Sequence, residues 1–334
     1  MRFSTFFLLC TTALIVLSGC GGGRPHVVLY CAQDREYAEL ILDQFSRETG
    51  ITVEVRSDTE ATKTVGLYEA IVRERQHPRC DVFWNNEIVN TLRLQQQGLL
   101  EPYASPSASP YPTWTRPIDF SWQAFAARAR VLIVHRRVPA KERPTTLRSL
   151  TEPRWKGRLA MAKPHFGTTA THMACLWSKW GPRQAKEFLL RLQENVTILG
   201  GNKDVALAVA EGRFDVGITD TDDAQIEVMK GMPVDIILPD QDGDGTLFLP
   251  NTLMLIKGGP NPTHARRLMD YLLSPAVEAR LADGPSSQIP LNPNVGTRSP
   301  IQRLGALRPM GVDFRSAAQH WEDVQNFLRA NFAR

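Results

Sequence analysis

The segment "HVVLYCAQDREYAELILDQFSRETGITVEV" spans residues 26–55 and decides the fold class. It begins with a short apolar run that is typical of a buried strand, and its apolar residues then recur at helical spacing until Gly50. The alternation in residues 51–55 predicts a second strand, and a helix over 64–76 and a strand over 80–84 follow. Strands and helices in this order predict an α/β fold with a mostly parallel sheet.

The rest of the chain continues the same alternation of strands and helices. Further strands are expected at residues 128–135, 158–162, 196–199, 214–219 and 232–239, and residues 246–258 form another apolar segment. Further helices are expected at residues 85–100, 168–181, 182–195, 204–212, 263–282 and 316–332. The segment 101–117 is rich in Pro and Ser, which predicts a loop or a connection between two lobes.

The bulk composition of the 334 residues excludes several classes of protein. Hydrophobic residues make up 43% and charged residues 22%, as in ordinary globular proteins. A formal charge of +4 is too small to imply a nucleic-acid partner. After residue 20, no apolar window is long enough for a membrane span. The chain has no GxSxG, HExxH or GxxxxGK[ST] motif, so an enzyme is not expected.

The N-terminus "MRFSTFFLLCTTALIVLSGC" has the composition of a secretory signal, with Arg2, an apolar stretch and then small residues. The final Leu-Ser-Gly-Cys resembles a bacterial lipobox, in which the cysteine becomes the lipidated N-terminus. Residues 1–19 are therefore predicted to be a lipoprotein signal peptide, and residues 20–25 a tether lipidated at Cys20. The expected location is the periplasmic side of the cell envelope. A plain cleaved signal or a short membrane anchor is the alternative.

Three cysteines remain in the predicted mature fold beyond Cys20. Cys31 ends one predicted strand and Cys80 begins another, so the two can form a disulfide if these strands are neighbours. The alternative is that Cys31, Cys80 and Cys175 are buried free thiols. No Cys or His spacing indicates a zinc site.

A cluster of three carboxylates, Asp220, Asp222 and Asp223, follows the predicted strand 214–219. Open α/β sheets bind ligands beyond the carboxyl ends of their strands, so the cluster is a candidate site. Three interpretations remain open. The carboxylates can cap the next helix, bind a metal ion through Asp222 or Asp223, or recognise a cationic or hydroxylated organic ligand.

Other polar residues at predicted strand ends are candidates for the same ligand. Beyond the first three strands these are Tyr30, Gln33, Asp34, Thr62, Lys63, Asn85, Asn86 and Glu87. The turn Gly167, Thr168 and Thr169 enters a helix and can hold an anion, with charge from Arg128 or Arg130. Each has an ordinary structural alternative, such as a helix cap or an exposed strand residue. His165 and His172 are not expected to be ligands.

The stretch "DQDGDG" at residues 240–245 matches the first half of a calcium-binding loop. The twelfth position is Asn251, where such loops carry Glu, and no flanking helix pair is predicted. A solvated turn and a structural cation site both remain open here.

Five segments in order resemble the extracellular solute-binding proteins (family 1) of ABC importers, and most closely their ferric-iron-binding periplasmic branch. They are "VVLYCAQDREYAELILDQFSRETGITVEV", "DVFWNNEIVNTLRLQQQGLLEPY", "RARVLIVH", "LRSLTEPRWKGRLAMAKP" and "VALAVAEGRFDVGITD". The resemblance implies a type II periplasmic-binding-protein fold, a monomer, and ABC permease and ATPase partners in the membrane. One lobe is expected to comprise 26–116 plus 247–300. The other comprises 117–246 plus 301–334 with the C-terminal helices.

The resemblance also implies a ligand in the cleft between the lobes. Iron-binding relatives usually carry two adjacent tyrosines where this chain has Asp222 and Asp223, so the ligand set is altered. Carboxylates are still hard oxygen ligands. We therefore expect an iron-like metal ion held by the three aspartates, with a synergistic anion such as carbonate or phosphate at residues 167–169. The alternatives are an organic anion, a phosphonate or a polyamine-like solute, or a lipoprotein that presents its ligand to a sensor.

Overall fold

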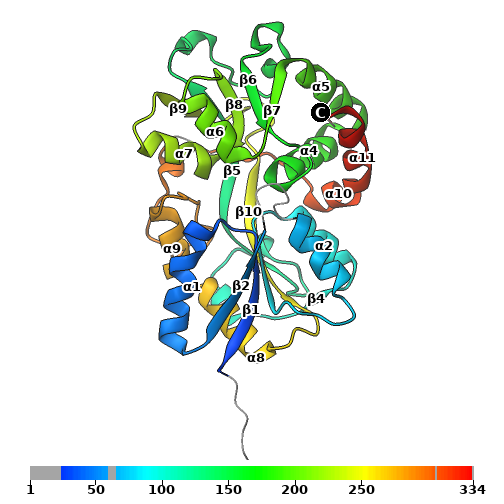
Figure 1. The fold of residues 1–334 in the computed structure, drawn as a ribbon, viewed down its shortest axis with the longest axis vertical. Helices are drawn as coiled ribbons and strands as arrows, with labels where there is room; N and C mark the ends of the chain where they lie inside the picture. The colour runs from blue at the N-terminus through cyan, green and yellow to red at the C-terminus, as the bar shows by residue number, and fades with distance from the viewer. Residues whose placement is uncertain (1–23, 59–64, 305–306, 333–334) are drawn as a thin grey trace, which may run out of the picture.

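Two α/β lobes joined by two long strands make up the computed structural model, which describes residues 24–58, 65–304 and 307–332 (Figure 1). The strands follow the order β2-β1-β3-β10-β5-β8-β6-β7, with β4 paired to β10 and β9 paired to β5. We call the half around β1, β2 and β3 the first lobe, and the half around β6 to β9 the second lobe. The lobe boundaries given above remain predictions.

The first lobe has the strand and helix order predicted for its sequence. Its strands are β1 (His26–Cys31), β2 (Thr52–Ser57), β3 (Val82–Asn85) and the short β4 (Leu100–Glu101). Its helices include α1 (Arg35–Thr49), α2 (Val65–Arg73) and α3 (Val89–Gln96). The strand β1 pairs in parallel with both β2 and β3. Burial of Leu29, Phe83 and Trp84 explains why these strands are continuous apolar runs.

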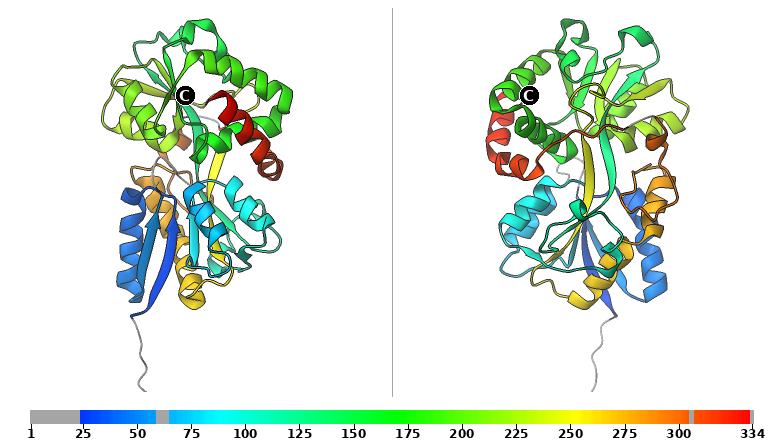
Figure 2. Two further views of the ribbon diagram at one scale, coloured as in Figure 1. Left: turned by 45° about the vertical axis from the view of Figure 1, so that its right-hand side comes forward. Right: turned by 180° about the vertical axis from the view of Figure 1, so that it is seen from behind.

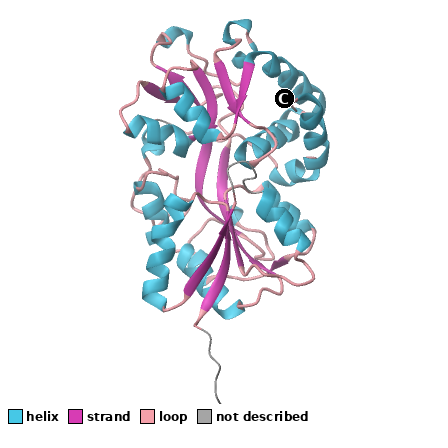
Figure 3. Ribbon diagram, viewed as in Figure 1, coloured by secondary structure: helices cyan, strands magenta, loops and turns pink. Residues whose placement is uncertain are grey.

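The second lobe repeats this plan at the other end of the molecule. Its strands are β6 (Leu159–Ala162), β7 (Val196–Leu199), β8 (Val216–Asp220) and β9 (Val234–Ile237). Its helices include α4 (Gly167–Trp180), α5 (Pro182–Asn195), α6 (Asn202–Ala210) and α7 (Thr221–Met229). The pairs β6–β7 and β6–β8 are parallel. The helices cover the outside of the strands (Figure 3).

The strands β5 (Gln123–His135) and β10 (Phe248–Ile256) connect the lobes and make the sheet mixed. Up to Ala129, β5 pairs antiparallel with β10, and from Arg130 onward it pairs antiparallel with β8. Opposite a register shift between Pro250 and Asn251, Ala126 has a φ of 39°, in the left-handed region. The backbone therefore departs from a regular ladder where the strands pass between the lobes.

Two of the predicted helices are wrong, since each stretch forms two shorter helices in the structure. The stretch 263–282 divides into α8 (Pro262–Leu272) and α9 (Pro275–Asp283), since Pro275 cannot donate the backbone hydrogen bond that would continue α8. The final stretch divides at His320 into α10 (Phe314–Gln319) and α11 (Trp321–Asn331). Both C-terminal helices lie beside α4, as Figure 2 shows from two further directions.

The cysteines are not cross-linked in the described part of the chain. Cys31, Cys80 and Cys175 are buried, and no disulfide joins Cys31 to Cys80, so the structure favours the thiol alternative over this pairing. Over the same ranges, no helix combines the length and apolar character that a membrane span requires.

Candidate functional site

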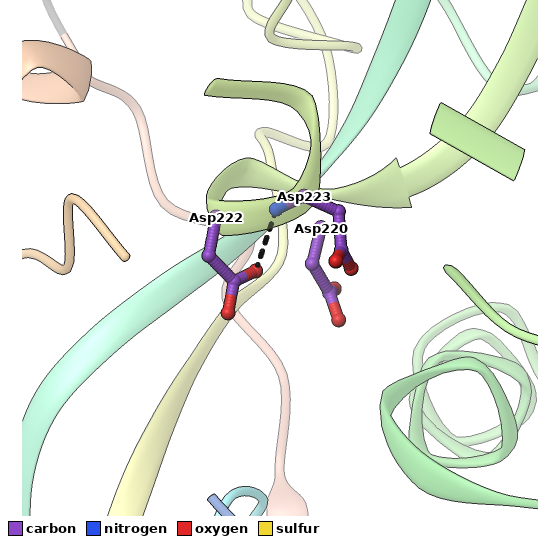
Figure 4. A group of neighbouring side chains, drawn as sticks. All are labelled: Asp220, Asp222 and Asp223. Atoms are coloured by element: carbon purple, nitrogen blue, oxygen red, sulfur yellow. Dashed lines mark hydrogen bonds between the residues drawn. The ribbon is translucent and has the colours of Figure 1, made fainter. Parts of the chain in front are cut away.

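The three aspartates lie at the end of β8 and the start of α7, as the sequence predicted. Asp220 ends the strand, and Asp222 and Asp223 belong to the first helical turn (Figure 4). One oxygen atom from each carboxylate lies within 4.8 Å of the others. Within the described ranges, they form the one group of three such side chains that is close enough to hold a metal ion.

Asp220 is held by the protein itself through both carboxylate oxygens. Arg130 lies directly opposite it in the β5–β8 register, and its Nη1 is 2.7 Å from Oδ1. The Oδ2 atom accepts hydrogen bonds from the Thr168 hydroxyl and, at 3.1 Å, from the Asn202 amide. Asp220 and Arg130 are both almost fully buried. This carboxylate therefore organises the site, which leaves Asp222 and Asp223 as the metal-ligand candidates.

Asp222 connects the cluster to the first lobe through Arg128. Its Oδ2 lies 3.3 Å from Nη1 of Arg128, and both side chains are 2% exposed. Arg128 also donates to Gln33 at 2.7 Å and to Asn251 at 3.1 Å. Burial lowers the pKa of Arg128, but the charge of Asp222, with smaller contributions from other carboxylates, raises it above its usual value overall. The arginine thus remains charged and links the first lobe, the crossing strands and α7.

Charged side chains of both signs meet in this buried centre. Among the described residues, the carboxylates of Asp220, Asp222 and Asp223 lie with the guanidinium groups of Arg128 and Arg130. Asp223 is the least buried of the three aspartates. A cation that enters from solvent would therefore meet Asp223 before the other two carboxylates.

An open cleft of about 620 Å³ lies beside Asp223, between α1 of the first lobe and α6 of the second. Its lining residues are mostly charged: Asp34, Arg35, Glu36, Glu39, Lys203, Asp204 and Asp223. Of the lining residues that the structure describes, five carry carboxylates and two are basic, so this lining is acidic. Lys203 reaches across it to Glu36 at 3.4 Å and so connects the lobes. The volume admits a hydrated metal ion or a small organic cation.

The start of α4 has no acidic or capping side chain, unlike the other helix ends at the site. Phe166 is the N-cap residue and makes no side-chain cap, and the first turn holds no carboxylate. The backbone amides of Gly167, Thr168 and Thr169 donate to no other residue in the described ranges. They border a cavity of about 20 Å³ with Asn86 of the first lobe, which is room for about one water.

Several predicted ligand residues do not line this cleft. The Tyr30 hydroxyl donates to Glu74 at 2.7 Å and accepts from Arg56, on the side of α2. Glu87 is fully buried, where it accepts from the amides of α3 and from the Thr171 hydroxyl of the second lobe. Of the remaining candidates, Gln33 bonds Arg128, Asp34 lines the cleft, and Asn86 borders the small cavity. Thr62 and Lys63 lie outside the described residues.

The stretch 240–245 forms a turn whose carboxylates contact the protein. Asp240 accepts from the amide of Leu147, and Asp244 accepts from the indole of Trp180 at 2.7 Å. These partners favour the solvated-turn interpretation over a cation site.

Sequence reasoning missed two residues of the site, Asn202 and Tyr37. Asn202 follows β7 and begins α6, so the strand-end rule that identified the other candidates also applies to it. Tyr37 lies one turn into α1. Burial raises the pKa of its phenol, and the charges of Asp222 and Asp223 raise it further. The helical spacing of the sequence predicts a core position for Tyr37. It gives no sign that the phenol lies near the charges of Asp222 and Asp223.

His172, which contacts Arg130, makes the stability of this centre depend on pH. Its Nδ1 lies 3.4 Å from Nε of Arg130, and burial, followed by the charge of Arg130, holds its pKa well below the usual 6.5. The folded protein therefore binds fewer protons than the unfolded chain below about pH 6.5. Its stability is expected to fall there by up to about 1.4 kcal/mol per pH unit from this residue.

Urea unfolding between pH 7.5 and pH 5 checks this dependence. The His172→Gln variant is expected to lose that part of the slope below about pH 6.5. His320→Gln, which removes an imidazole whose side chain is 42% exposed, is the control. Equal slopes in the unchanged protein and His172→Gln would contradict a buried neutral imidazole.

Two lobes with a cleft between them are the architecture of proteins that close around a small ligand. Residues 89–309 match the sequence profile of the bacterial extracellular solute-binding proteins, and the chain belongs to this family. The chain is similar to iron uptake protein A1 of Synechocystis sp., with 24% identity over 311 residues, which are 84% of this chain and 85% of the relative.

Two solved structures share the fold at low sequence identity. The ferric binding protein from Campylobacter jejuni has a TM-score of 0.82 and 22% identity, covering 91% of this chain and 98% of its own. The binding protein AfuA from Actinobacillus pleuropneumoniae, with fructose-6-phosphate bound, has a TM-score of 0.81 and 20% identity, covering 93% and 99%. The expected periplasmic-binding-protein fold is therefore confirmed. The chain is a non-catalytic solute-binding protein of ABC import that acts outside the cytoplasm.

Proposed function

We propose that this protein captures a metal cation in the acidic cleft and delivers it to an ABC permease. The convergence of Asp220, Asp222 and Asp223 within 4.8 Å carries the proposal, because it gathers carboxylate oxygens, which are hard ligands, at the edge of the cleft. The named iron-binding relatives support a metal cargo. Without the adjacent tyrosines expected of that branch, the ligand set here is made of carboxylates.

Asp223 and Asp222 are the proposed first ligands of the cation. Asp223 borders the open cleft, and Asp222 is supported by Arg128. Asp34 lines the same cleft from the first lobe, so it is placed to approach a cation when the lobes close. Water completes the coordination, because the cleft is much larger than a bare ion.

An organic solute with an anionic group is the second candidate for the cargo. The three amides at the start of α4, which donate to no residue that the structure describes, favour it, because helix N-termini attract anions. The fructose-6-phosphate bound by the Actinobacillus protein is a solute of this type. Such a ligand would direct its hydroxyl or cationic groups to Asp223.

Elemental analysis and mass spectrometry of the mature chain, purified without chelators, separate these two cargoes. The metal proposal expects about one equivalent of one metal per chain. A chain that contains no metal but retains a phosphorylated or phosphonate solute would contradict the metal proposal and support the second candidate.

We also propose that lipid on Cys20, which lies outside the described residues, holds the protein at a membrane surface. The lipobox-like end of the apolar N-terminal segment supports this. The Cys20→Ser variant is expected to move from the membrane fraction to the soluble fraction on cell fractionation. Cys10→Ser, within the apolar segment, is the control and should stay with the membrane. Membrane retention of Cys20→Ser would contradict lipidation at this residue.

A further inference from the structure

Arg130 and its neighbours form a complete set of anion-binding donors deep in the second lobe. The guanidinium group is fully buried and lies within hydrogen-bond distance of Thr168, at 3.2 Å, and Thr169, at 3.3 Å. Asn202, at the start of α6, is 3.1 Å from the same guanidinium. We call Arg130, Thr168, Thr169 and Asn202 the cradle. It combines a fixed positive charge with two helix N-termini, a combination that binds anions.

The anion in this cradle belongs to the protein. Asp220 places Oδ1 2.7 Å from Nη1 of Arg130, and its Oδ2 accepts from the hydroxyl of Thr168 and the amide of Asn202. The cavity left beside these residues is about 20 Å³. That volume holds about one water, and a phosphate group is larger than a water. An external anion would therefore have to displace Asp220 from these donors to occupy the cradle.

We propose that Asp220 is an internal counter-ion that fills the cradle and excludes the anionic groups of solutes from it. The carboxylate of Asp220 is part of β8, so it is held in the cradle by the fold. Its presence there does not depend on the concentration of anions in solution. Asp220 therefore selects the cargo by electrostatics and space, without coordinating the cargo itself.

The consequence of this arrangement for the cargo rests on the proposed function, in which the cargo is a metal cation. A cation bound by Asp222 and Asp223 needs no companion anion, because Asp220 already compensates Arg130. The synergistic anion expected from the resemblance is then unnecessary in this chain. Metal affinity should be the same with and without added carbonate or phosphate.

Removing the carboxylate should convert the cradle into a phosphate site. Calorimetric titration of the mature chain with inorganic phosphate, in the absence of metal, is expected to show no binding at millimolar concentrations. Asp220→Ala frees both charge and space, and its affinity for phosphate should rise by about a hundredfold or more. Phosphate should also raise the melting temperature of this variant and leave that of the unchanged chain where it was.

Asp220→Ser provides the same test with a smaller disturbance if Asp220→Ala does not fold. The matched control is Asp81→Ala, because Asp81 is a buried carboxylate held by the amide of Val28 and by Asn261, and no arginine in the described part of the chain binds it. It should lose stability without gaining phosphate affinity. Phosphate binding by the unchanged chain, or no gain in either Asp220 variant, would overturn the inference.

A second titration, with metal, keeps the two proposals distinguishable. Metal binding that requires added carbonate or phosphate would overturn the inference and leave the metal cargo intact. A gained phosphate site in the Asp220 variants, together with no metal binding by the unchanged chain, would support the inference and contradict the metal cargo.

Discussion

The Asp223→Asn variant is expected to bind the metal cargo about a hundredfold more weakly than the unchanged protein. The substitution keeps the shape of the side chain and removes the one of the cleft's negative charges that belongs to the aspartate cluster. An ion pair about 4 Å apart is worth about 4 kcal/mol at an effective dielectric constant near 20, and each ~1.4 kcal/mol changes affinity tenfold. Equilibrium dialysis followed by metal analysis measures the loss.

Two further variants distinguish the loss of a metal ligand from a general loss of negative charge. Asp323→Asn removes a carboxylate on α11 that is 73% exposed, so metal affinity should not change. The Asp222→Asn/Asp223→Asn double variant should lose metal binding altogether. Equal affinity in Asp223→Asn and the unchanged chain would show that the cation binds elsewhere.

The Arg130→Leu variant is expected to be destabilised by about 3–5 kcal/mol. This substitution leaves Asp220 buried without the cation that compensates it, and an unpaired buried charge is strongly unfavourable. The free energy of unfolding from urea titration measures the effect. Arg136→Leu breaks an ion pair with Asp235 whose side chains are 54% and 35% exposed, and should cost at most about 1 kcal/mol.

A double variant tests whether the loss comes from the unpaired charge. Replacing both partners, in Arg130→Leu/Asp220→Leu, removes the charge that Arg130→Leu leaves behind, so most of the stability should return. A loss below about 1 kcal/mol in Arg130→Leu would contradict the buried pair. A double variant no more stable than Arg130→Leu would attribute the loss to packing instead.

Strand ends were the informative part of the sequence. Apolar runs fixed β1, β3 and β8, and the rule that ligands bind beyond such strands placed Asp220, Asp222 and Asp223 correctly at the start of α7. The breaks in the helical stretches were harder to predict. Pro275 offered a local signal, whereas the division at His320 has no comparable residue.

Pairings between distant segments could not be predicted from local pattern. Arg130 meets Asp220 because β5 and β8 pair antiparallel in one register, and a shift by one residue would turn the arginine to the other face. Gln33 meets Arg128 across 95 positions of sequence, through the crossing of β5 between the lobes. For the same reason the sequence did not show that Glu87 supports α3 instead of facing the cleft.

Calorimetric titration of the mature chain with ferric, ferrous, manganese and calcium ions tests the central claim most directly. We predict stoichiometric binding of at least one of these ions, with the same affinity whether or not carbonate is present, and no heat in the Asp222→Asn/Asp223→Asn variant. No binding of any ion by the unchanged chain, in a preparation shown to be folded, would contradict the claim that the three aspartates mark a cation site.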